Sequence, residues 1–152
     1  MWELKILTVG KLKDRAIEAG VERYASMTGG EWRLVVESVK GSRRSDVAAS
    51  RREDSLALKK RLPRGAFPVA LDAGGRQRDS ADFARLLGRK KDRGTPVCFM
   101  VGGAYGLDLD ILEAPEILSL SPMTLSHEMA VLVLAEQIYR AYSIHTGKPY
   151  AK

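Results

Sequence analysis

Residues 98–107 read C-F-M-V-G-G-A-Y-G-L, and residues 117–147 read I-L-S-L-S-P-M-T-L-S-H-E-M-A-V-L-V-L-A-E-Q-I-Y-R-A-Y-S-I-H-T-G. In the first stretch an apolar run ends in a glycine turn. In the second, an apolar run ends in a polar turn with a proline, and a long apolar helix follows. When two strand ends and a helix start meet, they form a crevice lined by backbone. Ligands of open α/β sheets bind in such crevices.

The expected helix at 127–143 has no polar residue between Met129 and Ala135. A helix that is apolar on all sides must be buried on several of them. Its length is borderline for a bilayer, and charged residues such as Glu128 and Glu136 interrupt it. Two interpretations remain open. The helix packs against a second copy of the chain, or it forms the centre of one protomer's core.

Outward from this region, expected strands alternate with expected helices along the 152 residues. The expected strands are 2–9, 32–39, 67–72, 96–101 and 117–120, and the expected helices are 14–28, 47–62, 80–92, 108–114 and 127–143. This alternation predicts an α/β fold with a mostly parallel sheet and helices on both faces. At this length we expect a single domain, residues 1–152.

The helix expected at 47–62 has a modest apolar stripe. The stripe consists of Val47, Leu56, Leu58 and Leu62. Asp14, Ser45 or Asp46, Asp79 or Ser80, and Ser126 stand where N-caps are expected.

The net charge of +6 is concentrated in the middle of the chain, where residues 40–64 contain nine basic and three acidic residues. A clustered basic surface is typical of polyanion binders, so RNA is an expected partner through Arg43, Arg44, Arg51 and Arg52. The alternative is a solvated helix face without a partner.

Several classes of function find no support in the sequence. Cys98, His127 and His145 are the only soft metal ligands and lie well apart, so no metal site is expected. The chain has neither the G-x-G-x-x-G nor the G-x-x-x-x-G-K-[ST] motif, which argues against dinucleotide and triphosphate enzymes. The first residues already begin a strand pattern instead of a signal peptide, so we expect no membrane association and a cytoplasmic location.

Four C-terminal motifs carry a more specific resemblance. They are V-G-G-A-Y-G-L (101–107), L-S-L-S-P-M-T-L-S-H-E-M (118–129), A-E-Q-I-Y-R-A-Y-S-I (135–144) and Pro149-Tyr150. Together with L-K-I-L-T-V-G-K (4–11) and L-D-A-G-G-R (71–76), they resemble the small SPOUT-class methyltransferases that modify large-subunit ribosomal RNA. The resemblance spans the whole chain.

The resemblance implies properties that residue patterns alone do not predict. The fold would be an α/β trefoil knot, formed by a C-terminal segment that threads through a loop. The cofactor would be S-adenosylmethionine, and the enzyme a homodimer whose active site uses both subunits. The substrate would be pseudouridine 1915 of 23S ribosomal RNA, methylated at N3 on the assembled ribosome.

The resemblance also implies residue roles. The cofactor contacts would be Leu71, Gly103, Ser121, Pro122, Met123, Thr124, Leu125 and Ser126. His127 and Tyr150 would be the catalytic candidates for proton transfer from N3. A histidine with the usual pKa of about 6.5 is the better base at neutral pH, whereas a tyrosine near about 10 would need activation or would only orient the target.

Two positions depart from the family pattern near the expected substrate site. Val131 stands where relatives usually carry arginine, and Ala151 follows Pro149-Tyr150 where they usually carry histidine. A non-catalytic ribosome- or RNA-binding factor on the same fold is therefore the alternative function.

Overall fold

The structure, a computed structural model, describes residues 1–151. Five strands alternate with five helices in the order expected from the sequence. The elements are β1 (Trp2–Val9), α1 (Arg15–Met27), β2 (Trp32–Val39), α2 (Val47–Lys60), β3 (Phe67–Gln77), α3 (Ser80–Asp92), β4 (Val97–Val101), α4 (Leu109–Leu112), β5 (Glu116–Ser119) and α5 (His127–Thr146).

All strand pairs in the sheet are parallel, and the strand order is β2-β1-β4-β3-β5. The predicted parallel sheet is therefore confirmed. Because the strands are parallel, their carboxyl ends lie along one edge of the sheet. The ends of β4, β3 and β5 are neighbours there, so the loops that follow these strands gather at one place.

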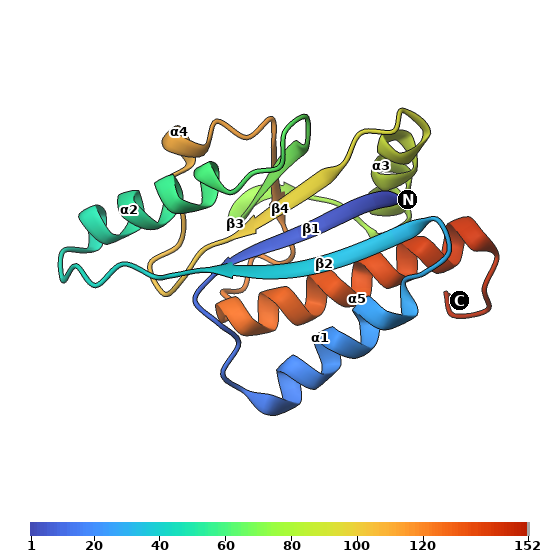
Figure 1. Ribbon diagram of the computed structural model, residues 1–152, viewed down its shortest axis with the longest axis horizontal. Helices are drawn as coiled ribbons and strands as arrows, with labels where there is room; N and C mark the ends of the chain where they lie inside the picture. The colour runs from blue at the N-terminus through green and yellow to red at the C-terminus, as the bar shows by residue number, and fades with distance from the viewer. Residues whose placement is uncertain (152) are drawn as a thin grey trace.

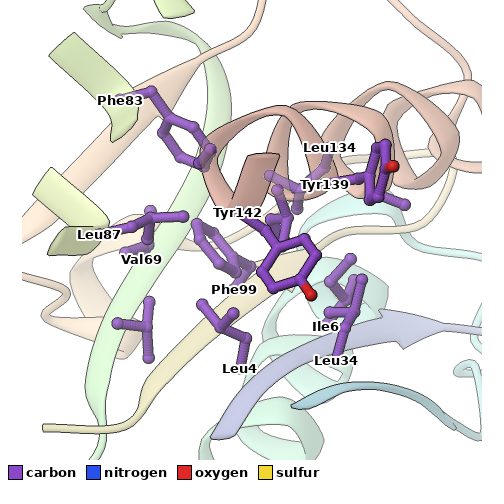
Figure 2. Close-up of a cluster of buried hydrophobic side chains, with 14 of the residues drawn as sticks. Leu4, Ile6, Leu34, Val69, Phe83, Leu87, Phe99, Leu134, Tyr139 and Tyr142 are labelled. Atoms are coloured by element: carbon purple, nitrogen blue, oxygen red, sulfur yellow. The ribbon is translucent and has the colours of Figure 1, made fainter. Parts of the chain in front are cut away.

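Helices cover both faces of the sheet, as predicted (Figure 1). Helices α2 and α4 lie over one face, and α1, α3 and α5 lie over the other. The larger core lies between the sheet and the second group (Figure 2), and Leu4, Ile6, Phe99, Leu134 and Ile138 are fully buried in it. Cys98 belongs to the smaller core under α2, where burial raises the pKa of its thiol to about 12.

Helix α5 lies between α1 and α3 and packs along the sheet (Figure 1). This arrangement in one protomer buries Val131, Leu134, Ala135 and Ile138 completely. Met129 remains 40% exposed. The helix extends to Thr146, three residues beyond the expected end, and Gly147 closes it in the left-handed conformation with φ 71°.

Only two of the four residues in the apolar stripe of α2 are turned away from solvent. Val47 is 43% and Leu56 is 47% exposed, while Leu58 is buried and Leu62 is half-buried. The buried side of the helix consists of Ser50, Asp54, Ser55 and Leu58. The physical reason is that Asp54 and Ser55 accept hydrogen bonds from the backbone of loops at the sheet's carboxyl edge.

Strand β3 is also longer than the expected 67–72. It pairs with β5 up to Leu71 and again from Arg76, and the register shifts between these two residues. The four intervening residues bulge out beside the end of β5. Gly75 permits this close approach, since a Cβ at its position would lie 2.6 Å from the backbone oxygen of Ile117.

Candidate active site

A cavity of about 220 Å³ lies at the carboxyl ends of β4, β3 and β5. Three loops and the first turn of α5 form its walls. The lining residues are Leu71, Asp72, Ala73, Val101, Gly102, Gly103, Ala104, Gly106, Leu118, Leu120, Ser121, Met123, Thr124, Leu125, His127 and Ala130. The crevice predicted from the strand-end turns is therefore present.

The glycine turn, residues 102–106, forms the first wall. Gly103 and Gly106 form an antiparallel bridge, and the N–H of Gly106 donates to the carbonyl of Gly103 at 3.1 Å. Gly106 has a φ of +75°, which favours glycine. A Cβ on Gly102 would lie 2.7 Å from the carbonyl carbon of Gly106, so the tight turn excludes a larger residue at this position.

The bulge of β3 forms the second wall. Asp72 accepts a hydrogen bond from the N–H of Gly74 through Oδ2 at 2.9 Å. The hydroxyl of Ser119 donates to the carbonyl of Ala73 at 2.9 Å, which attaches the bulge to β5. The half-buried carboxyl group of Asp72 thereby becomes part of the cavity lining.

The polar turn before α5 forms the third wall. Ser121 accepts a hydrogen bond from the N–H of Met123 at 3.0 Å, and Ser126 caps α5 by accepting from the N–H of Met129 at 3.3 Å. Met123 itself is 75% exposed. The N-terminal end of α5 is the positive end of the helix dipole, so His127 lines the cavity at a partly positive site.

Most of the expected cofactor residues line this cavity. Leu71, Gly103, Ser121, Met123, Thr124 and Leu125 do so, whereas Pro122 and Ser126 lie in the same turn without lining it. Asp72 and Leu118 also line the cavity, although the sequence did not single them out. Asp72 stands directly after the expected end of a strand, so its position was the signal that could have identified it.

Tyr150 does not line the cavity and lies away from His127 within one protomer. Its hydroxyl donates to Oε1 of Glu136 at 3.1 Å, and its ring packs edge-on against Tyr139 with centroids 4.7 Å apart. Glu136 is nine residues along α5 from His127, or about 14 Å at the usual helical rise. Burial, followed by hydrogen bonds with Tyr24 and Glu136, raises the pKa of Tyr150 to about 12.

Arg140 belongs to the same cluster. Its guanidinium donates to Glu136 at 2.6 Å, and this hydrogen bond raises the pKa of Arg140. The guanidinium carbon also lies 5.0 Å from the centroid of the Tyr150 ring. The cluster therefore holds the end of the chain against the middle of α5.

The four expected RNA contacts differ in their surroundings. Arg43 and Arg52 are exposed and form no ion pair with any of residues 1–151. Arg44 pairs with Glu53, and Nε of Arg51 donates to the backbone carbonyl of Tyr105 at 2.8 Å. Arg51 therefore already binds the glycine turn.

The two departures from the expected family pattern lie in different surroundings. Val131 is 0% exposed and belongs to the core between α5 and the sheet, so it does not line the cavity. Ala151 follows Tyr150 in the tail and is half-buried.

Residues 1–151 contain no group of three or more His, Cys, Asp or Glu arranged to hold a metal ion. No helix within the same range has the length and hydropathy required to cross a membrane.

A family profile described as "Predicted SPOUT methyltransferase" matches residues 2–151. The chain belongs to the SPOUT methyltransferase family. Among its relatives is "Ribosomal RNA large subunit methyltransferase H" of Gluconacetobacter diazotrophicus, 45% identical over 148 residues, which cover 97% of this chain and 95% of the relative. A relative of the same name from Geotalea daltonii is 37% identical over 150 residues, 97% of each chain.

Two solved structures share the fold of this SPOUT methyltransferase. One is a methylase family protein from Neisseria gonorrhoeae, with a TM-score of 0.56 and 16% identity over 90% of this chain and 81% of the other. The second is a methyltransferase from Bordetella pertussis Tohama I, with a TM-score of 0.54 and 17% identity over 91% and 93%. At this identity the likeness concerns the fold alone.

Proposed function

We propose that this SPOUT methyltransferase transfers a methyl group from S-adenosylmethionine to N3 of pseudouridine 1915 in 23S ribosomal RNA, on the assembled ribosome. The observation that carries the proposal is the strand-end cavity in a chain 45% identical to a ribosomal RNA large subunit methyltransferase H along nearly its whole length. The proposal treats residues 1–152 as one catalytic domain.

The residues that line the cavity are chemically suited to bind S-adenosylmethionine. The glycine turn presents backbone groups without large side chains, and Leu71, Leu118 and Leu125 provide apolar walls for a flat base. Hydroxyl groups of Ser121 and Thr124 and the carboxyl group of Asp72 can hold polar and positively charged parts of the cofactor. The contacts we propose are those of Leu71, Gly103 and residues 121–126.

In the reaction, the N3–H bond of the pseudouridine breaks and an N3–CH₃ bond forms. The cofactor supplies the methyl group from its sulfonium and leaves as S-adenosylhomocysteine. The chain must orient the base and accept the N3 proton. We assign proton acceptance to the imidazole of His127, since it lines the cavity and since histidine is the usual base near neutral pH. Positioning supplies much of the remaining rate enhancement.

Tyr150 is proposed as a group that orients the target rather than as the base. Its hydroxyl holds its proton up to about pH 12, and it lies far from His127 along α5. In the proposed homodimer, the tail of one subunit would contribute to the site of the other. The same proposal includes the trefoil knot and a cytoplasmic location.

The RNA is proposed to bind the basic loop after β2 and the start of α2, through Arg43, Arg44 and Arg52 with Arg51 beside them. Lys11 and Lys13 are exposed in the loop after β1, and β1 is the neighbour of β2 in the sheet, so these lysines would add positive charge at this edge. Affinity for RNA should therefore fall steeply with salt, in proportion to the number of phosphates neutralised.

The test is transfer of labelled methyl from S-adenosylmethionine to intact ribosomes that lack this modification, with separated large subunits assayed in parallel. The proposal predicts transfer to intact ribosomes. Binding of the cofactor without transfer to either substrate would instead favour the alternative, an RNA-binding factor without turnover. The departures at Val131 and Ala151 are the observations that favour that alternative.

A further inference from the structure

Helix α2 has an unusual buried side. Ser50, Asp54 and Ser55 are 4%, 6% and 0% exposed, and Leu58 is the one apolar residue of the helix buried with them. Burial of polar side chains costs free energy unless they are hydrogen-bonded. A helix that only had to cover the sheet would bury an apolar stripe instead. The buried side of α2 is therefore built for specific hydrogen bonds.

Two side chains of α2 bind the glycine turn and the residues that follow it: Ser55 from the buried side, and Arg51 from the partly exposed side next to it. The hydroxyl of Ser55 accepts from the backbone N–H of Asp108 at 2.8 Å. One helical turn earlier, Nε of Arg51 donates to the backbone carbonyl of Tyr105 at 2.8 Å. Arg51 and Ser55 thus bind the backbone before and after Gly106, whose φ is positive.

Asp54 lies between these two residues and binds a different loop. Its Oδ1 accepts from the backbone N–H of Ser42 at 2.7 Å. Its Oδ2 faces the glycine turn, since a Cβ on Gly103 would lie 3.8 Å from it. The basic loop that begins at Lys40 and the glycine turn of the cavity are therefore both supported by one turn of α2.

Besides its own hydrogen bond from Gly106 to Gly103, most of the glycine turn is exposed. Ala104, Tyr105 and Gly106 are exposed, and glycine-rich backbone loses more conformational entropy on ordering than other backbone does. Residues 102–106 are nonetheless the wall that must keep its shape if the cavity is to bind a ligand.

We infer that Arg51 and Ser55 are positioning residues that hold the glycine turn in its ligand-binding shape, with Asp54 joining the same support to the basic loop. This inference rests on the proposed function in taking S-adenosylmethionine as the ligand of the cavity. Arg51 then contributes to cofactor binding without touching the cofactor. Its main role is to bind Tyr105, not an RNA phosphate.

The experiment compares Arg51→Ala with Arg52→Ala, a neighbouring exposed arginine without an ion pair among residues 1–151. Isothermal titration with S-adenosylmethionine should show an affinity about tenfold weaker for Arg51→Ala, the size expected for one lost hydrogen bond from a charged group. Arg52→Ala should bind like the unaltered protein. Arg51→Lys should recover part of the affinity, since its ammonium can still donate to Tyr105.

Two further measurements separate positioning from other roles. In methyl transfer, Arg51→Ala should raise KM for S-adenosylmethionine and retain most of kcat at saturation. In RNA binding, Arg52→Ala should reduce the slope of log affinity against log salt concentration by about one, the value for one lost phosphate contact. Arg51→Ala should leave this slope unchanged. A reduced salt dependence in Arg51→Ala with an unchanged cofactor affinity would overturn the inference.

Hydrogen exchange of residues 102–108 in the ligand-free protein tests the inference independently of the cofactor. Faster exchange in Arg51→Ala and Ser55→Ala, but not in Arg52→Ala, supports it even if the unaltered protein fails to bind S-adenosylmethionine. That failure would refute the proposed cofactor, not the role of α2. Equal exchange rates in all variants would overturn the role of α2, whatever the cofactor.

Discussion

The hydroxyl of Tyr150 donates to Oε1 of Glu136 at 3.1 Å, and this bond attaches the end of the chain to the middle of α5. Gly147 makes the arrangement possible, because its left-handed backbone reverses the chain after the helix. His127 is the first residue of α5 and lines the cavity. The two catalytic candidates therefore occupy separate places in this chain.

The first prediction concerns the dependence of methyl transfer on pH. Because Tyr150 keeps its proton up to about pH 12, Tyr150→Phe should change the rate without moving the apparent pKa of the profile between pH 6 and 9. His127→Asn should remove the proposed proton acceptor and lower kcat by about 10²–10⁴-fold. Single-turnover rates on ribosomes provide the measurement. A shift of the profile in Tyr150→Phe alone would assign the proton to the tyrosine.

The second prediction concerns stability at alkaline pH. The folded state raises the pKa of Tyr150 from about 10 to about 12, so it binds the phenolic proton more tightly than the unfolded chain does. This contribution to stability is complete below pH 10 and disappears as the pH rises towards 12. Urea unfolding of the unaltered protein and Tyr150→Phe should therefore differ less at pH 11.5 than at pH 8. A constant difference would show that the tyrosine pKa is not raised.

The third prediction concerns the glycine turn. Gly102→Ala places a methyl group against the carbonyl carbon of Gly106, so the turn must open. Overpacking of this kind typically lowers the free energy of unfolding by about 1–3 kcal/mol, and we expect cofactor affinity to fall at least about tenfold. Calorimetric titration and urea unfolding measure the two effects. Gly29→Ala is the control, since nothing lies within 4 Å of its added methyl, and unaltered binding by Gly102→Ala would exclude the turn from the site.

The fourth prediction concerns Thr8, whose buried hydroxyl is the one deeply buried side-chain polar atom without a hydrogen bond in residues 1–151. Thr8→Val keeps the shape and removes the unpaired group, so it should raise the free energy of unfolding by about 1 kcal/mol. Thr28 offers a matched control, because its buried hydroxyl donates to the carbonyl of Tyr24 at 2.8 Å. Thr28→Val should lower stability by a similar amount, and a loss in Thr8→Val would show that its hydroxyl has a partner in solution.

Local sequence signals predicted the order of the elements well, because apolar runs, caps and glycine breaks act over a few residues. Asp14, Asp46, Asp79 and Ser126 cap helices at positions expected from the sequence. The polar buried side of α2 was not predictable in the same way. Its partners are remote in sequence, since Ser55 and Asp108 are 53 residues apart.

In the candidate site, too, local sequence patterns were predictive, whereas contacts between remote residues were not. Turns directly after strands predicted the cavity, and most of the expected cofactor residues line it. The bulge that brings Asp72 into the lining depends on pairing between β3 and β5, which no local pattern specifies. The place of Tyr150 depends on contacts with Tyr24, Glu136 and Tyr139, so the short terminal motif alone could not give it.

The most direct test of the central proposal is to map the methyl group after transfer to intact ribosomes. Ribosomes that carry uridine in place of the target pseudouridine serve as the matched substrate control. The proposal predicts one methyl group on N3 of the pseudouridine, with little transfer to the uridine-containing ribosomes and much slower transfer with His127→Asn. Methyl transfer to another nucleotide, or equal transfer by His127→Asn, would contradict it.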